Sequence, residues 1–208
     1  MTQVYGPELH TQLGHGIPVP GKSRGSMDCG PQTVRTGIQR LTMGDLLPSV
    51  QEVRRRMGKP GPVTTNTTDA ERCVESYDLE MRAIDRKPLI YVRLRGASAE
   101  AMLRDAMKAG LYVQWAIDYG TFNRRMNGHT GDPNFDGGHS VGGFGWDRRR
   151  IRGGRHWRVF WGLMDPLDDG RRPGITDGPR WIRPGPLLAA WASLGHFAGI
   201  FKGGERTL

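Results

Sequence analysis

One stretch, residues 26–41, limits what this chain can fold into more than any other. It runs as a short polar loop into Cys29, and a helical pattern begins there. The apolar residues of one helix face recur at four- and three-residue spacing: Val34, Ile38 and Leu41. Pro31 suits the first turn of a helix, where its missing N–H needs no partner. We therefore expect a helix over 29–41 that is buried on one side.

Cys29 at the start of a helix has two interpretations. The thiol faces unpaired backbone N–H groups and the positive end of the helix dipole, and both favour the nucleophilic thiolate. A buried cysteine can equally act as a small apolar residue. The second cysteine, Cys73, is expected to pack in the core. Two cysteines without a CxxC pair form neither a disulfide framework nor a zinc site, so we expect no metal and no cofactor.

Composition indicates one globular domain. The 208 residues suit a single sizeable core, with a hydrophobic fraction of 37% and a mean hydropathy of -0.54. No apolar run approaches the roughly 20 residues that cross a bilayer, so membrane contact is not expected. Residues 1–20 contain no signal-peptide pattern, which leaves the location open; a phage particle is one option. We expect an extended arm over 1–26 and one domain over 27–208.

The formal charge of +9 comes mainly from arginine. Runs occur at 54–56 and 148–150, and residues 147–158 contain six arginines and one aspartate. The ordinary interpretation is a solvated basic surface. The functional one is contact with a polyanion or an acidic partner. The candidate contact residues are Arg148, Arg149, Arg150, Arg152 and Arg155.

The predicted elements place helices first and strands later. Helices are expected over 29–41, 47–57, 70–77, 99–109 and 187–194, with Thr68 or Asp69 capping the third. Strands are expected over 79–84, 89–94, 111–117, 139–146, 156–164 and 197–201, with loops over 123–136 and 168–186. This order is typical of an α+β fold with a mostly antiparallel sheet.

Chemistry-bearing residues converge on the predicted hairpin. His139 opens one strand and Asp165 ends the next, so the hairpin can bring the two side by side. Cysteine catalysis needs an imidazole to take the thiol proton and an acceptor to orient that imidazole. Two acidic and histidine clusters, at 129–139 and 165–170, match no metal-binding spacing, and no metal site is predicted there.

Three motifs in order resemble the papain-like cysteine peptidases, most closely the branch that trims double-glycine leaders from bacteriocin precursors. The first is Asp-Cys-Gly-Pro at 28–31. The second is Gly-His at 138–139, followed by Gly-Trp-Asp at 145–147 where the family has Gly-Tyr-Asp. The third is Asp-Pro at 165–166. The match spans about Asp28 to Pro166 and implies a papain-like fold, with the nucleophile helix packed on the sheet.

The resemblance also implies roles for individual residues. Cys29 would be the nucleophile, His139 the general base and acid, and Asp165 the orienting carboxylate. The family places an oxyanion-stabilising glutamine six residues before the cysteine, where this chain has Ser23. A serine hydroxyl can donate instead, and the backbone N–H of Cys29 remains, whereas loss of one oxyanion donor typically costs about 100- to 1,000-fold in rate.

Two functions of different classes follow. The first is a thiol hydrolase that cleaves a peptide or amide bond in a protein precursor or a cell-wall peptide. The second is a structural component of a phage tail or connector that keeps the fold and acts by binding, with residues 1–26 reaching other chains. The basic hairpin, Ser23 and the arginine- and glycine-rich composition favour the second. Nucleic-acid binding is a third possibility that rests on charge alone.

Overall fold

The computed structural model describes residues 28–61, 63–127, 129–130, 133–150, 157–166 and 180–207. The predicted arm over 1–26, which includes Ser23, lies outside the described residues, as do Arg152 and Arg155. The boundary between arm and domain therefore stays a prediction. Among the described residues, no helix has the length and apolar character that spanning a bilayer requires.

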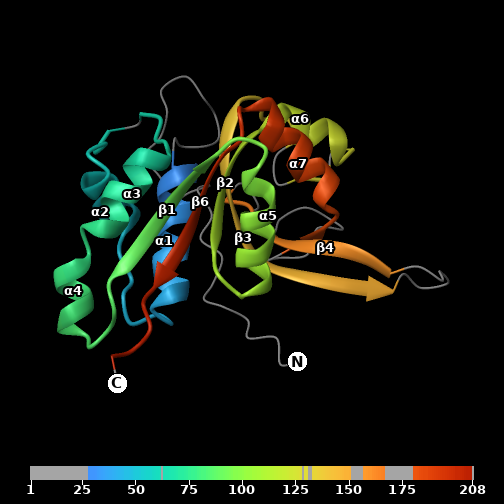
Figure 1. Cartoon of the computed structure of the whole chain (residues 1–208). Helices are drawn as coiled ribbons and strands as arrows, with labels where there is room; N and C mark the ends of the chain where they lie inside the picture. Colours follow the sequence, from blue (N-terminus) through green and yellow to red (C-terminus); the bar gives the residue numbers. More distant parts are fainter. Residues whose placement is uncertain are drawn as a thin grey trace.

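A six-stranded sheet forms the centre of the molecule, in the order β1-β6-β2-β3-β4-β5 with antiparallel pairing throughout. The helices are α1 (Cys29–Leu41), α2 (Val50–Arg56), α3 (Thr67–Glu75), α4 (Asp78–Ala83), α5 (Ala99–Lys108), α6 (Tyr119–Arg125) and α7 (Pro184–Ser193). The strands are β1 (Leu89–Arg95), β2 (Val113–Asp118), β3 (Gly138–Arg150), β4 (Trp157–Met164), β5 (Arg180–Ile182) and β6 (Phe197–Gly203). The predicted α+β class is confirmed (Figure 1).

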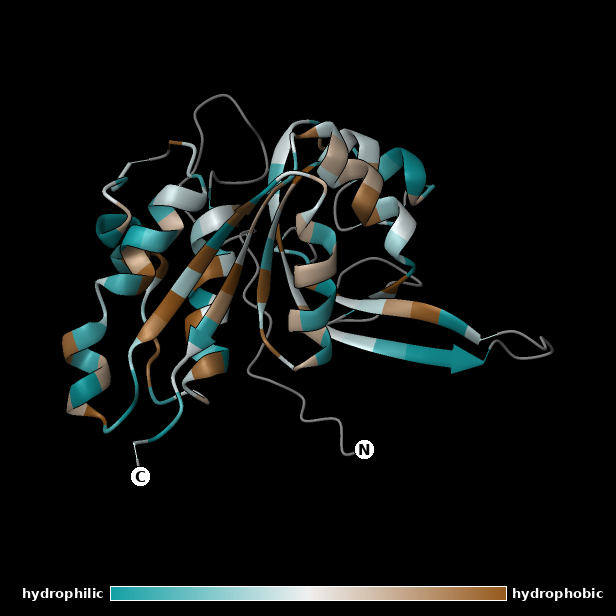
Figure 2. Ribbon diagram, in the orientation of Figure 1, coloured by the Kyte–Doolittle hydropathy of each residue, from teal (hydrophilic) through white to brown (hydrophobic). Residues whose placement is uncertain are grey.

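Two apolar clusters hold the layers together. One joins α5, α6 and α7 to β2, β3 and β4, and its centre is the indole of Trp115, whose ring centroid lies 5.4 Å from Trp161 and 5.2 Å from Trp191. The other joins α1 to α4 with β1 and β6. Hydrophobic segments accordingly run along the central strands, whereas the outer part of β3 is hydrophilic and β4 carries a hydrophobic segment beside it (Figure 2).

Helix α1 has the bounds that the apolar spacing predicts. Val34 and Ile38 are fully buried in the second cluster. Gly37 permits a close approach to β6, because a Cβ there would lie 2.8 Å from the Phe201 ring. The chain then reverses through Met43 and Gly44, both at positive φ.

The predicted strand over 79–84 is wrong, because this segment forms α4. Met81 is buried, whereas Leu79 is 77% exposed, so its apolar residues do not occupy one face of a strand. Asp78 and Arg82 form an ion pair of 2.7 Å across one helical turn. A single inward-pointing methionine and this helical pair suit one short helix at the edge of the domain.

Several boundaries also differ from prediction. Helix α3 is capped by Asn66, whose side chain accepts from the N–H groups of Thr68 and Asp69, so the predicted cap is two to three residues late. Helix α2 begins after the Ser49 cap, three residues later than expected. Helix α6 and strand β5 were not predicted: α6 begins before the predicted loop over 123–136 and overlaps its start, and β5 lies within the predicted loop over 168–186.

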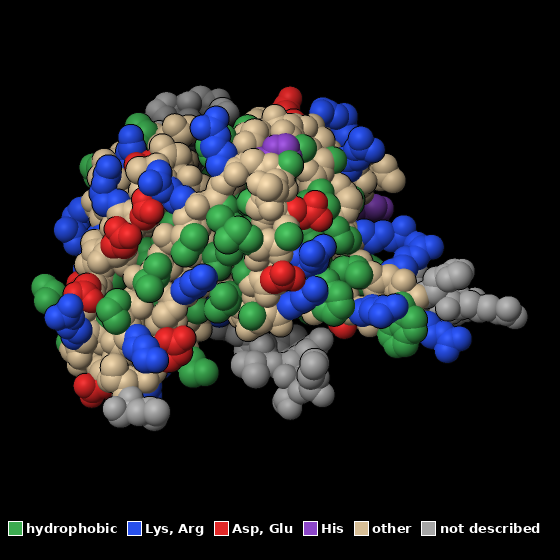
Figure 3. Space-filling view, viewed as in Figure 1, with side chains coloured by type: hydrophobic (Ala, Val, Ile, Leu, Met, Phe, Trp, Pro, Cys, Tyr) green, Lys and Arg blue, Asp and Glu red, His purple; other side chains and the backbone are tan. Residues whose placement is uncertain are grey.

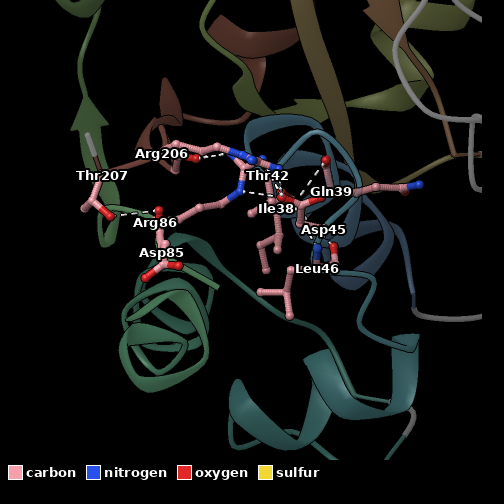
Figure 4. A network of polar contacts seen from close by, with 10 residues as sticks. Ile38, Gln39, Thr42, Asp45, Leu46, Asp85, Arg86, Arg206 and Thr207 are labelled. Carbon is pink, nitrogen blue, oxygen red and sulfur yellow. Dashed lines mark hydrogen bonds and ion pairs between the residues drawn. The ribbon is translucent and has the colours of Figure 1, made fainter. Parts of the chain in front are cut away.

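The C-terminal segment is tied to the end of α1 by a polar network (Figure 4). Buried Arg86 donates to Asp45 Oδ2 through Nε at 2.9 Å and Nη2 at 2.6 Å, and to the carbonyl of Gly204. The backbone N–H of Thr207 donates to the carbonyl of Asp85 at 2.8 Å. These contacts fix α1 at the end opposite Cys29.

Candidate active site

Cys29 is the first residue of α1 and is half-buried. The preceding residue, Asp28, is fully buried and forms an ion pair with Arg54, which is also fully buried. Gly30 allows the loop after α2 to approach, since a Cβ at Gly30 would lie 2.1 Å from Thr65 Oγ1. The start of the helix is therefore held between a buried charge pair and a tightly packed loop.

Arg54 corrects one expectation about the basic runs. Part of the 54–56 run is not a solvated surface, because Arg54 Nη1 also donates to the carbonyls of Gly61 at 2.6 Å and Val63 at 3.2 Å. Arg56 also makes contacts within the chain, because it forms ion pairs with Glu52 and Glu80. Both arginines thus stabilise the helical layer that carries Cys29.

His139 and Asp165 meet across the β3–β4 hairpin. His139 is the second residue of β3, and Asp165 directly follows the last residue of β4. His139 Nε2 lies 2.8 Å from Asp165 Oδ1, and both side chains are buried. A carboxylate can only accept, so Nε2 carries the proton in the neutral ring, and Nδ1 is left as the basic nitrogen.

The Cys29 thiol interacts with the His139 ring. Nδ1 is buried and does not meet the geometry of a full hydrogen bond with any described group, yet the two side chains are close enough to change each other's pKa. Burial raises the pKa of the Cys29 thiol. The interaction with His139, together with the N–H groups of Ser140 and Gly30, outweighs burial and lowers the pKa below its ordinary value.

The pKa of His139 moves in the opposite direction. Burial lowers it, but the charge and hydrogen bond of Asp165, with a further contribution from Cys29, raise the pKa to about 9. A thiol of lowered pKa beside an imidazole of raised pKa favours the thiolate–imidazolium pair near neutral pH. Cys73 provides the contrast, because burial raises its pKa to about 12.

Aromatic residues that the sequence did not indicate surround the histidine. Tyr119 follows β2 and donates its hydroxyl to Asp165 Oδ2, while its ring stands edge-on to His139 at 4.6 Å. Phe135 lies 5.8 Å from the same ring. No local pattern points to Tyr119, whose place depends on the sheet register that pairs Ile117 with His139. These rings exclude water from the imidazole–carboxylate pair.

The remaining predicted candidates lie elsewhere. Arg148, Arg149 and Arg150 are on the outer part of the β3–β4 hairpin, far along β3 from His139. Within the described ranges, no three histidine, cysteine, aspartate or glutamate side chains group to hold a metal ion. The structure thus brings together Cys29, His139 and Asp165 and keeps the basic residues apart from them.

The comparisons bear on the fold. No family model matches the chain, and no curated protein does. A crystal structure from Bacillus anthracis, provisionally described as a C39-like peptidase, matches with a TM-score of 0.55 over 98% of this chain and 96% of that one, at 15% identity. The chain has a C39-like peptidase fold. The predicted papain-like fold is confirmed, whereas the leader-trimming branch stays a prediction.

Proposed function

We propose that the protein is a thiol hydrolase that cleaves a peptide or amide bond with Cys29, His139 and Asp165. The observation that carries this proposal is the coupled pair at the start of α1: a thiol of lowered pKa beside a buried imidazole whose other nitrogen lies 2.8 Å from a carboxylate. The likeness to a C39-like peptidase at the level of fold supports the same class.

The geometry suits acyl transfer through a covalent intermediate. The Cys29 thiolate attacks the carbonyl carbon, and the carbon–nitrogen bond breaks as the His139 imidazolium gives its proton to the leaving amine. Water then attacks the thioester, with His139 taking the proton from water, and the acid product and thiol are released. Asp165 holds the ring so that Nδ1 faces the reaction.

Stabilisation of the oxyanion draws on the start of α1. The backbone N–H of Cys29 is among those without a partner inside the helix, and the helix dipole adds positive potential there. In the resembled family a glutamine supplies a second donor, and the corresponding residue here is Ser23, outside the described residues. We expect a hydrolase that is slow on generic substrates for this reason.

The substrate is proposed to be a polypeptide or a cell-wall peptide. The structural alternative, a phage tail or connector component that acts by binding, remains the second candidate. One described feature favours it: the projecting basic hairpin, which lies apart from Cys29. Its other support, the contact of residues 1–26 with further chains, lies outside the described residues.

The test compares turnover by the wild type and by Cys29→Ala on a mixed library of fluorogenic peptide amides and on purified muropeptides. A Ser23→Gln variant is included, because restoring an amide donor should increase turnover at least tenfold if the oxyanion site is incomplete. His139→Ala should abolish turnover, and its circular dichroism spectrum should match that of the wild type. The hydrolase proposal is refuted if cleavage persists unchanged in Cys29→Ala. It is also refuted if even Ser23→Gln shows no cleavage that depends on Cys29, and the structural role is then the function that is left.

A further inference from the structure

The outer part of the β3–β4 hairpin is a two-stranded ribbon that leaves the domain (Figure 1). β2 pairs with β3 only as far as Gly143, and β5 pairs with β4 only from Trp161 inward. Beyond these points, among the described residues, the two strands pair with each other: Arg148 is opposite Val159, Arg149 opposite Arg158 and Arg150 opposite Trp157. Each strand therefore presents alternate side chains to two different surfaces.

One surface of this ribbon carries an exposed indole between two guanidinium groups. Trp157 is 56% exposed, and Arg150 stands directly across from it. Arg148 is on the same side, with its guanidinium carbon 5.7 Å from the centroid of the Trp157 ring. We call Arg148, Arg150 and Trp157 the Trp157 face. It continues the sheet face of Trp146 and Trp161, which packs under α5 and α7.

On the opposite surface of the ribbon, Arg149 makes contacts within the chain. Arg149 forms an ion pair with Asp147 at 2.6 Å, and its guanidinium carbon lies 4.6 Å from the Trp181 ring and 5.9 Å from Phe160. Asp147 is the one acidic residue in 144–150 and 157–162, against four arginines. Basic side chains consequently dominate the projecting hairpin at the right of the space-filling view (Figure 3).

We propose that the Trp157 face binds single-stranded nucleic acid. An exposed aromatic ring flanked by arginines matches the two needs of such a ligand, since the ring stacks on an unpaired base and the guanidinium groups contact the adjoining phosphates. Residues 147–158 contain six arginines and no lysine, and the planar guanidinium is the group suited to bidentate phosphate contacts and to stacking. This inference is independent of the proposed hydrolase.

The test measures binding of the full chain to a fluorescein-labelled dT30 strand, to a 30-base-pair duplex and to vesicles of phosphatidylserine and phosphatidylcholine, at about 50 to 200 mM salt. Trp157→Ala should weaken dT30 binding about tenfold or more, because base stacking contributes about 1–3 kcal/mol per base. Arg148→Gln with Arg150→Gln should reduce the slope of log affinity against log salt by about 1.4, since each single-strand phosphate contact contributes about 0.7.

The matched control is Arg149→Gln with Arg158→Gln, which removes the same charge from the same ribbon on the other surface. It should leave the salt slope for dT30 near the wild-type value. Equal weakening by both double variants shows a general charge effect and overturns the proposal. Tighter binding to duplex or to vesicles than to dT30, or no binding to dT30 at about 50 mM salt, also overturns it. Thermal melting by circular dichroism checks that each variant is folded.

Discussion

Asp165→Asn tests the electrostatic coupling within the candidate site. Asparagine keeps the size of the side chain and an oxygen that can accept from His139 Nε2, but it removes the negative charge. The pKa of His139 is about 9 in the folded protein, against about 6.5 for a free histidine. That difference corresponds to roughly 3 kcal/mol, or a roughly 300-fold change in the ratio of imidazolium to imidazole.

The sign of the effect follows from the direction of the pKa. A raised pKa keeps the ring charged below about pH 9, and the charged ring in turn lowers the pKa of Cys29. Burial by itself lowers the pKa of His139, and Asp165 makes the largest contribution that opposes it, so loss of the Asp165 charge should lower the pKa and the charged fraction of the ring at pH 7.5. We expect the thiolate population of Cys29 at pH 7.5 to fall by a factor between about 10 and 300.

The assay is the rate of Cys29 alkylation by iodoacetamide from pH 5 to 10, measured by mass spectrometry of the Cys29 peptide. Cys73 is the internal reference, because it is buried with a pKa near 12 and stays unreactive while the protein is folded. Asp78→Asn, on α4, makes the same chemical change away from the site. If the Asp165→Asn profile coincides with those of the wild type and Asp78→Asn, then Asp165 does not control the protonation of His139.

Two further substitutions test the surroundings of the site. Tyr119→Phe keeps the ring that contacts His139 and removes the hydroxyl that donates to Asp165, so the free energy of unfolding in urea should fall by about 2 kcal/mol. Tyr77→Phe is the control, because the buried Tyr77 hydroxyl makes no hydrogen bond within the described residues. Arg54→Ala removes the cation beside buried Asp28, so the free energy of unfolding should fall by about 3–5 kcal/mol and the melting temperature by about 6–20 °C. Arg55→Ala, at an exposed position, should change the melting temperature little. A small effect of Arg54→Ala would contradict the anchoring role of the pair.

The sequence predicts the fold best where one local signal agrees with the tertiary contacts. The spacing of apolar residues places α1 correctly because Val34 and Ile38 are the residues that enter the core. The spacing is misleading at 79–84, where polar and apolar residues alternate as in a strand but form a helix. Of the longer apolar side chains in this segment, Met81 is buried and Leu79 is exposed. Short helices such as α4 and α6 gain most of their stability from packing, and a local pattern cannot show this packing.

The candidate site likewise contains residues that the sequence predicts and residues that it does not. Cys29, His139 and Asp165 are recognisable because each lies at the end of an element, next to a glycine or a proline. Arg54 is not recognisable, because a basic run on an amphipathic helix resembles a solvated surface until Asp28 is seen beside it. Tyr119 depends on the sheet register that brings Ile117 opposite His139. Such partners are long-range contacts with no sequence spacing of their own.

The same strand, β3, carries His139 near one end and the Trp157 face at the other, and their separation makes a last prediction possible. Arg149 lies ten positions after His139, or about 30 Å along the strand, whereas charges in water are screened beyond about 8–10 Å at moderate salt. Removing the charges of Arg148 and Arg150 should therefore leave the pH profile of Cys29 alkylation unchanged. A profile moved by one pH unit or more would show that the hairpin and the site are coupled through the sheet. An unchanged profile would show that the charges of the hairpin do not reach the thiolate.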